Sequence, residues 1–345
     1  MMSFYTPRKK VIILAASLFF LLCAIFLVGL WYYLITPLKS GGAAQVFVVR
    51  EGATLRQVSG ELEQRGLISG KGLFLLWTRI MGYSRSIKAG EYRLNSGMPP
   101  LEICEILRKG IIITHSLTVP EGFTMHQIGT LLEQKGLADK TEFLELAADQ
   151  EVTGNYGVNG SSMEGYLYPD TYQFGRGLST ISIIDVMVMR FKEVYTPLHK
   201  RAKLMGMTME EVVTLASIVE KETGQAEERP VIASVFLNRL KKGMRLESDP
   251  TVIYGLGNFN GNLTKKDLVA YTPYNTYVIH GLPRGPISNP GLGAIKAVLH
   301  PAKTDYLYFV SRNDGSHFFS RNLSEHNRAV KLYQKKKRPG PGKTS

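Results

Sequence analysis

The sequence predicts an α+β protein with a single N-terminal transmembrane helix, a β-α-α-β repeat region and a mixed helical and β domain. Three observations lead to this prediction. Residues 11–35 are almost wholly apolar, the segment at 51–67 recurs at 121–137, and helical periodicity dominates from about residue 185 onward. The 345 residues are enough for two to three modest domains in addition to the membrane segment.

The first element is the run VIILAASLFFLLCAIFLVGLWYYLI at residues 11–35. A membrane-spanning helix needs roughly 20 apolar residues, and the aromatic residues at 31–33 lie where aromatic belts form. The basic residues at 8–10 precede the run, so the positive-inside rule predicts residues 1–10 in the cytoplasm and the chain after the run outside it. The alternative is a cleaved signal peptide, but its apolar region spans only roughly 7–15 residues and no A-x-A site follows here.

An internal repeat comes next, because EGATLRQVSGELEQRGL recurs 70 residues later as EGFTMHQIGTLLEQKGL. Thr54 and Thr124 each stand three residues before a Gln, which is the pattern of a helix-capping box. Gly66 and Gly136 follow the last helical residues and favour helix termination. A short β-branched run precedes each helix, and a second helix-like stretch and a strand-like piece follow it. Two β-α-α-β units are therefore predicted.

These two units, at residues 45–115 and 116–180, resemble the LysM type of glycan-binding module in their layout. The resemblance implies sugar binding. A scaffold that only positions the next part of the chain is the alternative.

The C-terminal half is predicted to be one domain, at residues 185–334, followed by a basic, disordered tail at 335–345. Asn313 and Gly315 fall in a turn between two β-rich runs and predict a β-hairpin. Helices are expected at 185–203, 207–223 and 227–243, at short stretches after 248 and 289, and from 324 onward.

Composition excludes several functions. The formal net charge of +13 indicates a polyanionic partner, such as nucleic acid, anionic lipid or an acidic wall polymer. No nucleic-acid motif occurs, so nucleic acid is not an expected partner. The seven histidines show no H-x-x-x-H spacing and the two cysteines do not join them, so no metal site is expected. A G-x-S-x-G elbow and a phosphate loop are also absent from the sequence.

Glu220 lies in the stretch LASIVEKETG, at the end of a predicted helix. Apolar Ile218 and Val219 precede it, and the small Ala216, Ser217 and Gly224 leave room for a sugar ring. A carboxyl group that is to donate a proton near neutral pH needs such an apolar, poorly solvated setting. The other interpretation is an ordinary amphipathic helix with a charged edge.

Polar and aromatic side chains gather in the same half of the sequence, and carbohydrate sites use aromatic faces for pyranose rings and amides for hydroxyl groups. Asp249 and Asn289 each precede a proline and are alternatively helix N-caps, and Asn238 could equally be an exposed helix position. The candidate substrate-binding residues are Ser217, Asn238, Asp249, Tyr254, Tyr274, Asn275, Tyr277 and Asn289.

Four long segments, together with EGYLYPDTY at 164–172, carry a resemblance to a known family. They are LASIVEKETG, ERPVIASVFLNRLKKGMRLESDPTVIYGLG, YTPYNTYVIHGLPRGPISNPGLGAIKAVLHP and YLYFVSRNDGSHFFSRNLSEHN. In these segments the chain resembles the MltG (YceG-like) endolytic murein transglycosylases of bacteria.

The resemblance implies a LysM-like N-terminal region and a YceG-like catalytic domain at 185–334. It implies cleavage of the MurNAc–GlcNAc β-1,4 bond of nascent peptidoglycan strands, which gives 1,6-anhydroMurNAc ends and terminates elongation. Glu220 falls on the catalytic glutamate of the family, and no cofactor is implied. The implied partners are glycan strands, the membrane and wall-synthesis enzymes such as glycan polymerases. The implied location is the cell inner membrane, with the catalytic domain periplasmic.

Two other functions stay open. A hydrolytic muramidase would need a second carboxylate to hold a water or act as nucleophile, for which Asp249 and Glu222 are the candidates. A non-catalytic, membrane-anchored glycan-binding scaffold would use the repeat alone.

Overall fold

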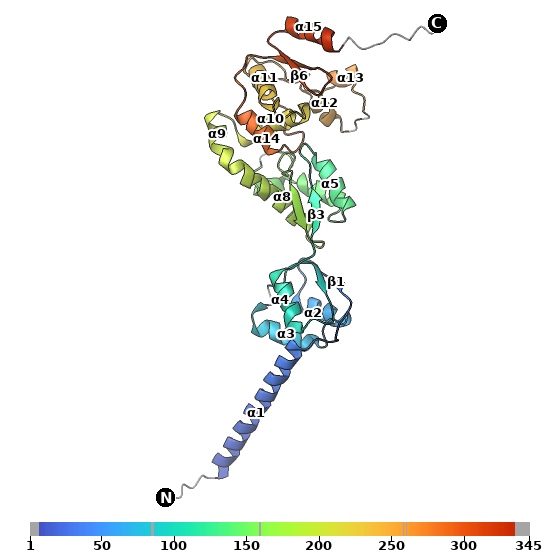
Figure 1. Ribbon diagram of the computed structural model, residues 1–345. Coiled ribbons are helices and arrows are strands. Elements are labelled where there is room, and N and C mark those ends of the chain that lie inside the picture. The colour runs from blue at the N-terminus through green and yellow to red at the C-terminus, as the bar shows by residue number, and fades with distance from the viewer. Residues whose placement is uncertain (1–6, 84–85, 159, 258, 260, 335–345) are drawn as a thin grey trace, which may run out of the picture. The chain divides into compact units, whose positions relative to one another are not determined.

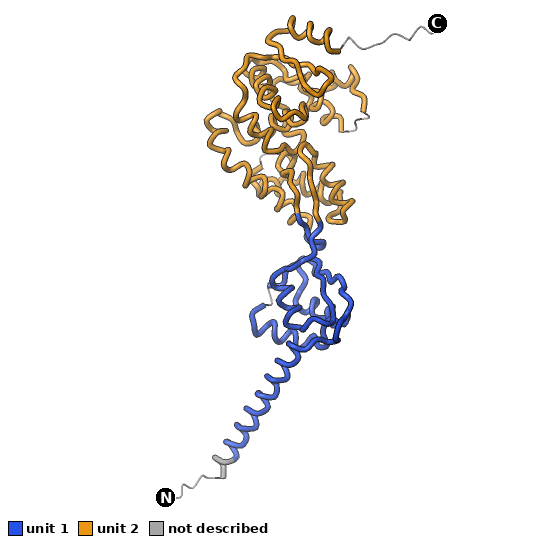
Figure 2. Tube along the Cα trace, viewed as in Figure 1, with its two compact units in different colours: residues 1–115, 173–178 blue, residues 116–172, 179–345 orange. Residues whose placement is uncertain are grey.

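The computed structural model describes residues 7–83, 86–158, 160–257, 259 and 261–334. The predicted tail at 335–345 and most of the predicted cytoplasmic segment lie outside these residues. The chain has mixed α and β structure (Figure 1). It divides into two compact units: residues 1–115 with 173–178, and residues 116–172 with 179–345 (Figure 2).

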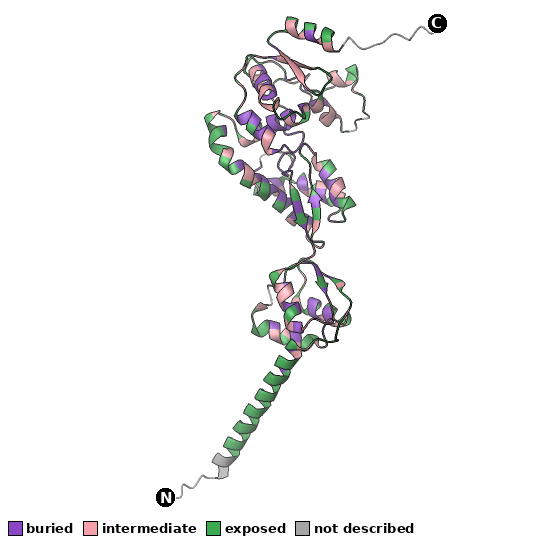
Figure 3. Cartoon of the chain, in the orientation of Figure 1, coloured by how far each residue is buried: buried purple, intermediate pink, exposed green. Residues whose placement is uncertain are grey.

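The N-terminal helix α1 (Pro7–Ile35) contains the predicted apolar run. Its segment Val11–Ile35 is long and apolar enough to cross a membrane. The segment is exposed along most of its length (Figure 3), but Leu30 and Leu34 in its last turns are buried. The Tyr33 hydroxyl donates to the carbonyl of Gly70 at 2.9 Å, so the end of α1 packs within unit 1.

The first repeat forms unit 1 together with α1. Strands β1 and β2 pair antiparallel, and their alternation turns Phe47, Val49 and Tyr92 into the core. The elements are β1 (Gln45–Val49), α2 (Leu55–Gln64), α3 (Lys71–Ile80), β2 (Gly90–Leu94) and α4 (Pro100–Lys109). Helix α4 was not predicted, although Pro100 at its first turn and Gly110 in the left-handed conformation at its end are ordinary helix signals.

The second repeat belongs to the same unit as the C-terminal half, apart from the ends of its two strands. Strands β3 and β4 pair with each other, and the helix α7 between them was not predicted. The elements are β3 (His115–Thr118), α5 (Met125–Gln134), α6 (Lys140–Ala147), α7 (Gln150–Asn155) and β4 (Thr171–Phe174). Both copies therefore keep the β-α-α-β order with an additional helix.

The C-terminal half is mainly helical and ends in the predicted hairpin and a last helix. The helix predicted at 185–203 begins earlier, at Thr180, and is interrupted at Pro197. The elements are α8 (Thr180–Tyr195), η2 (Thr196–Leu198), α9 (His199–Leu204), α10 (Met209–Glu222), α11 (Arg229–Lys241), α12 (Asp249–Leu256), α13 (Lys265–Val269), α14 (Leu292–Leu299), β5 (Tyr308–Ser311), β6 (His317–Ser320) and α15 (Leu323–Tyr333).

Helix α10 runs through the core of unit 2. Residues 212–219 are all buried (Figure 3), and the helix packs against α14, α11 and α12. A helix that is apolar on all sides is typical of a core and not of an amphipathic surface helix. Glu220 is the first charged side chain after this buried stretch.

Candidate active site

Glu220 lies in the last turn of α10, where the core ends. Its side chain is only 5% exposed, so solvent reaches the carboxylate poorly. The carboxylate has two hydrogen-bond donors. The Arg229 guanidinium donates through Nη2 to Oε1 at 2.8 Å, and the amide of Gly291 donates to Oε2 at 3.0 Å. One donor comes from the start of α11 and the other from the residue that precedes α14.

The electrostatic setting favours the protonated form of Glu220. Burial raises the pKa of the Glu220 carboxyl above its ordinary value, and the Glu121 carboxylate acts in the same direction. The Gly291 amide and the Arg229 guanidinium lower this pKa but do not cancel the effect of burial. The C-terminal end of a helix also disfavours a negative charge. Glu220 is thus able to hold a proton and to release it to a bound group, which is the requirement for a general acid.

A second carboxylate stands beside Glu220. Glu121, in the loop before α5, accepts from the same Arg229 Nη2 at 3.3 Å, and its side chain is 48% exposed. Because both carboxylates bind one nitrogen, their nearest oxygens are within about 6 Å of each other. Glu121 was not among the candidates from the sequence, and it comes from the second copy of the repeat.

A contact between α11 and β6 holds Arg229 in place. Glu228, the residue before it, accepts from the backbone amide of His317 at 2.8 Å and lies 2.6 Å from His317 Nδ1. This contact fixes the start of α11 to β6. Arg229 was not among the candidates from the sequence either, although it lies in the ERP segment at 228–230, shortly after VEKET at 219–223.

A second buried carboxylate, Glu164, lies in a separate network. Both of its oxygens accept from the amide of Met125, at 3.0 and 3.1 Å, and Asn289 Nδ2 donates to Oε1 at 2.9 Å. The Tyr254 hydroxyl donates to Oε2 at 3.1 Å. Burial raises the pKa of Glu164 to about 8, although these hydrogen bonds lower it.

Asn289 connects the two networks. Its Oδ1 accepts from the amides of Gly165 and Leu167, both at 2.9 Å, and its Nδ2 donates to the carbonyl of Phe123 at 2.9 Å as well as to Glu164. Gly291, which donates to Glu220, follows Asn289 by two residues. The predicted substrate ligand Asn289 is fully buried, and its amide is used within the fold.

Three other predicted substrate-binding side chains also have partners within the fold. The Ser217 hydroxyl donates to the carbonyl of Thr214 at 2.7 Å and accepts from the amide of Ile287 at 3.0 Å. The Asn238 and Asn275 amides donate to backbone carbonyls, those of Thr304 and Tyr306 for Asn238, and those of Asp267, Leu268 and Ala270 for Asn275.

The remaining predicted residues form two pairs. The rings of Tyr254 and Tyr274 meet edge to face with 4.8 Å between their centroids. The Tyr277 hydroxyl donates to Asp249 Oδ1 at 2.6 Å. This second pair lies at a cavity of about 320 Å³, lined by Glu222, Arg239, Leu246, Glu247, Asp249, Tyr277, Tyr308, Phe309, Leu323 and His326.

Glu222 also lines this cavity and lies two residues after Glu220 on α10, roughly 200° further around the helix. It accepts from the Ser248 hydroxyl at 2.5 Å, and burial raises its pKa to about 7. Neither of the two candidates for a second carboxylate, Asp249 and Glu222, shares a hydrogen-bond donor with Glu220. Glu121 does.

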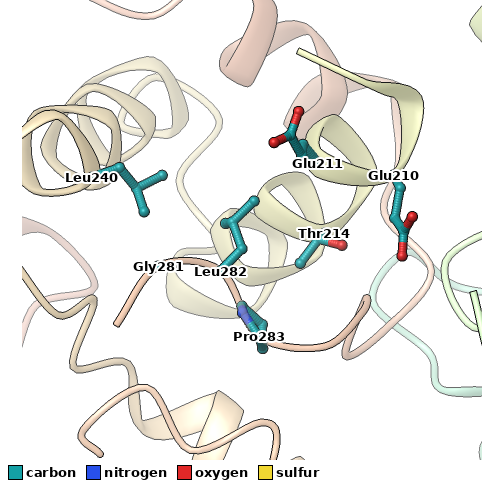
Figure 4. Close-up of a pocket in the computed structure, with 7 residues that line it drawn as sticks. All are labelled: Glu210, Glu211, Thr214, Leu240, Gly281, Leu282 and Pro283. Carbon is teal, nitrogen blue, oxygen red and sulfur yellow. The ribbon is translucent and has the colours of Figure 1, made fainter. Parts of the chain in front are cut away.

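Another cavity, of about 400 Å³, lies at the opposite end of α10 (Figure 4). It is lined by Glu210, Glu211, Thr214, Leu240, Gly281, Leu282 and Pro283. At a rise of about 1.5 Å per residue, Glu210 lies roughly 15 Å along the helix axis from Glu220. This cavity is therefore separate from the Glu220 network. Within the described part of the chain, no three His, Cys, Asp or Glu side chains lie together so that they could hold a metal ion.

Comparisons with known proteins show which family the chain resembles. The model of the YceG-like family matches residues 47–332. An endolytic murein transglycosylase of Bacillus subtilis (strain 168) is 32% identical over 317 residues, which cover 87% of this chain and 88% of that protein. An endolytic murein transglycosylase of Streptococcus pneumoniae serotype 2 (strain D39) is 30% identical over 85% of this chain, and the match spans 59% of that longer protein.

A solved structure is also similar. The crystal structure of a YceG-like protein from Listeria monocytogenes matches with a TM-score of 0.59 at 34% sequence identity, over 84% of this chain and 100% of that chain. The chain therefore belongs to the YceG-like family.

Proposed function

We propose that the protein is a membrane-anchored endolytic murein transglycosylase. It cleaves the MurNAc–GlcNAc β-1,4 bond within nascent peptidoglycan strands, leaves 1,6-anhydroMurNAc ends and so terminates strand elongation. The observation that carries this proposal is the buried Glu220 carboxyl at the end of α10, held by Arg229 and Gly291. The relatives named endolytic murein transglycosylases support the same reaction.

Glu220 acts first as the acid. It gives its proton to the glycosidic oxygen as the bond from that oxygen to muramoyl C1 breaks, and the GlcNAc hydroxyl leaves. The resulting carboxylate is stabilised by the Arg229 guanidinium and the Gly291 amide, which already lie on its two oxygens.

Glu220 then acts as the base. The C6 hydroxyl of the same muramoyl residue attacks C1 and loses its proton to Glu220, which closes the 1,6-anhydro ring. No water is consumed, and the carboxyl group returns to its starting form. One residue therefore suffices for both proton transfers.

The rest of the chain has a supporting role in this proposal. Residues 45–115 and 116–180 are LysM-like modules, and residues 185–334 form the catalytic domain. Helix α1 anchors the protein in the cell inner membrane with residues 1–10 in the cytoplasm, so that the catalytic domain is periplasmic, close to glycan polymerases. The length and apolar character of α1 support a membrane span, and the basic residues at 8–10 support the orientation. No cofactor takes part.

Hydrolysis is the second candidate, because Glu121 supplies a carboxylate near Glu220. The upper bound of about 6 Å includes the separation of roughly 5–5.5 Å found in retaining hydrolases. A hydrolase would give reducing ends that are heavier than anhydro ends by one water.

Product analysis tests the proposal. The full-length protein in detergent is incubated with uncrosslinked glycan strands, and the products of wild type and Glu220→Gln are compared by mass spectrometry. We expect anhydro ends from the wild type and a loss of rate of about 10²–10⁴-fold in the variant. Reducing ends would establish hydrolysis instead, and equal activity of the two proteins would remove Glu220 from the mechanism.

A further inference from the structure

The Arg229 guanidinium serves two carboxylates with one nitrogen. Nη2 donates to Glu220 Oε1 at 2.8 Å and to Glu121 Oε2 at 3.3 Å. Arg229 Nε is buried and has no hydrogen-bond partner among the described residues, so the two carboxylates are the side-chain partners that the structure gives to this cation. Glu121 and Glu220 therefore compete for one positive charge.

Two glycines keep the space that this arrangement needs. A Cβ atom on Gly291 would lie 1.8 Å from Glu121 Oε1, and one on Gly293 would lie 2.5 Å from Arg229 Nη1. The backbone of Gly291 has φ −77° and ψ 170°, which any residue adopts without strain. Its lack of a side chain is thus required by the position of Glu121 and not by the backbone.

The charges around Glu220 come from three elements. Glu121 faces it from the loop before α5, and Arg229 faces it from α11. The loop before α14 contributes only the uncharged Gly291 amide. On α10 itself, Lys221 Nζ donates to the carbonyl of Gly122 at 3.3 Å. Tyr168 also lies close enough to Glu121 for the carboxylate to raise the pKa of its phenol, after the larger effect of burial.

This arrangement resolves a conflict in the mechanism. A guanidinium at 2.8 Å, acting alone, favours an ionised Glu220, yet the acid step needs the protonated form. A second carboxylate on the same nitrogen offsets the positive charge. Once Glu220 has given up its proton, Arg229 is still in place to stabilise the anion.

We propose that Glu121 is a positioning residue of the reaction, which shares the Arg229 guanidinium with Glu220 and so lets Glu220 keep the proton that it donates. The inference rests on the proposed function, in which Glu220 is the acid. It also makes the second copy of the repeat a part of the active site, because Glu121 is the first residue of its EGFT motif.

The first copy supplies a matched control. Glu51 occupies the same place in EGAT, and it lies in unit 1 instead of at the site. The full-length protein in detergent is assayed for anhydro products on uncrosslinked strands from about pH 5 to about pH 8. The variants are Glu121→Gln, Gly291→Ala, which displaces the Glu121 side chain while retaining the Gly291 amide, and Glu51→Gln.

In wild type the rate falls as the pH rises and Glu220 loses its proton. In Glu121→Gln and Gly291→Ala this fall moves to lower pH by about one pH unit, so the rate drops roughly tenfold at neutral pH and recovers at acid pH. The profile of Glu51→Gln matches that of wild type.

Profiles that coincide with wild type, or an equal loss of rate at every pH, would overturn the inference, since a merely structural Glu121 would not change the pH dependence. If Glu121→Gln does not fold, the profile of Gly291→Ala decides alone. Failure of the proposed function looks different: wild type would give no anhydro ends, or Glu220→Gln would remain active.

Discussion

The two copies of the repeat have nearly the same local structure and are used differently. Thr54 and Thr124 both form a complete capping box with the Gln three residues later. Gly52 and Gly122, the second residues of the two motifs, have φ values of +78° and +75°. Sequence identity at these positions therefore specifies the same turn and the same start of a helix in both copies.

The surroundings of the two turns differ. In the first copy, residues 48–53 line an open cavity of about 260 Å³ together with the start of α2. In the second copy, the amide of Gly122 donates to the carbonyl of Asn289 at 2.9 Å, and the amide of Asn289 donates to the carbonyl of Phe123 at 2.8 Å. Glu121 binds Arg229. A repeated motif therefore fixes a turn, whereas the segment that packs on the turn gives it a role in the site.

The largest expected effect comes from removing the side chain of Asn289, which lies in the segment that packs on the second turn. Asn289→Ala would leave the buried amides of Gly165 and Leu167 without their side-chain acceptor, and the carboxyl of Glu164 would lose one of its donors. We expect a loss of about 3–5 kcal/mol in the free energy of unfolding, measured in urea, because each buried unpaired group costs roughly 1–3 kcal/mol. The exposed Asn155 supplies the control Asn155→Ala. Equal stability of the two variants would mean that the buried Asn289 amide stabilises the second turn no more than an exposed side chain does.

The pH dependence of stability tests the surroundings of the second turn, where Glu164 accepts from the amide of Met125. The pKa of Glu164 is raised to about 8 in the folded chain, so folding binds a proton between its ordinary value of 4.5 and about 8. Stability that Glu164 contributes at acid pH is therefore lost as the pH rises through this range.

Thermal melting of wild type and Glu164→Gln across this range measures the effect. We expect the melting temperature of wild type to fall more steeply with pH than that of the variant. Glu222, with a pKa raised to about 7, acts in the same direction in both proteins and cancels in the comparison. Exposed Glu133 supplies the control Glu133→Gln, and parallel curves for Glu164→Gln and wild type would contradict the prediction.

Alanine substitutions at the two matched glycines separate the effect of the turn's backbone geometry from the effect of the groups around it. Gly52→Ala and Gly122→Ala both place a side chain at positive φ, which costs each about 1 kcal/mol of stability. A Cβ on Gly122 would contact Glu220 Cγ and Lys221 Cδ at 3.5 Å, whereas one on Gly52 would contact nothing within 4 Å. We expect a severalfold loss of rate in Gly122→Ala alone. An equal loss of activity in both variants would break the distinction between the two turns.

The smallest effect tests the shared local structure. Thr54→Ala and Thr124→Ala each remove one capping hydrogen bond to the amide of the Gln three residues on, at 3.3 Å in both copies. Each variant should lose about 1 kcal/mol in urea unfolding. Values that differ by more than about 1 kcal/mol would show that the caps are not equivalent.

Much of the fold could be predicted because its signals are local. The capping boxes, the glycine C-caps and the hairpin at Asn313 depend on residues within one or two turns of each other. The start of α8 could not, because the β-branched residues that follow Ser179 have a low helix propensity. Burial of Ile183 and Ile184 in the core of unit 2 overrides that propensity.

The site was less predictable because its partners are distant in sequence. Glu220 was selected from its apolar and small neighbours and from the resemblance of its VEKET segment to a known family. Arg229 follows it by 9 residues on another helix, Gly291 by 71, and Glu121 lies 108 residues from Arg229. Asn238, Asn275 and Asn289 had the residue type of sugar ligands, but the sequence does not reveal which amides a fold will use for its own carbonyls. Their roles toward substrate stay predictions.

The packing at the end of α1 decides where the chain can be truncated to give a water-soluble form. Leu30, Tyr33 and Leu34 face unit 1, while Trp31 and Tyr32 are exposed on the other side of the same turns. The segment after the helix is no loose spacer either, since the amide of Lys39 donates to the carbonyl of Ser96 at 3.0 Å. A water-soluble form should therefore start ahead of Leu30 and carry polar residues in place of Trp31 and Tyr32. The last turns of α1 therefore belong both to the apolar helix and to the core of unit 1.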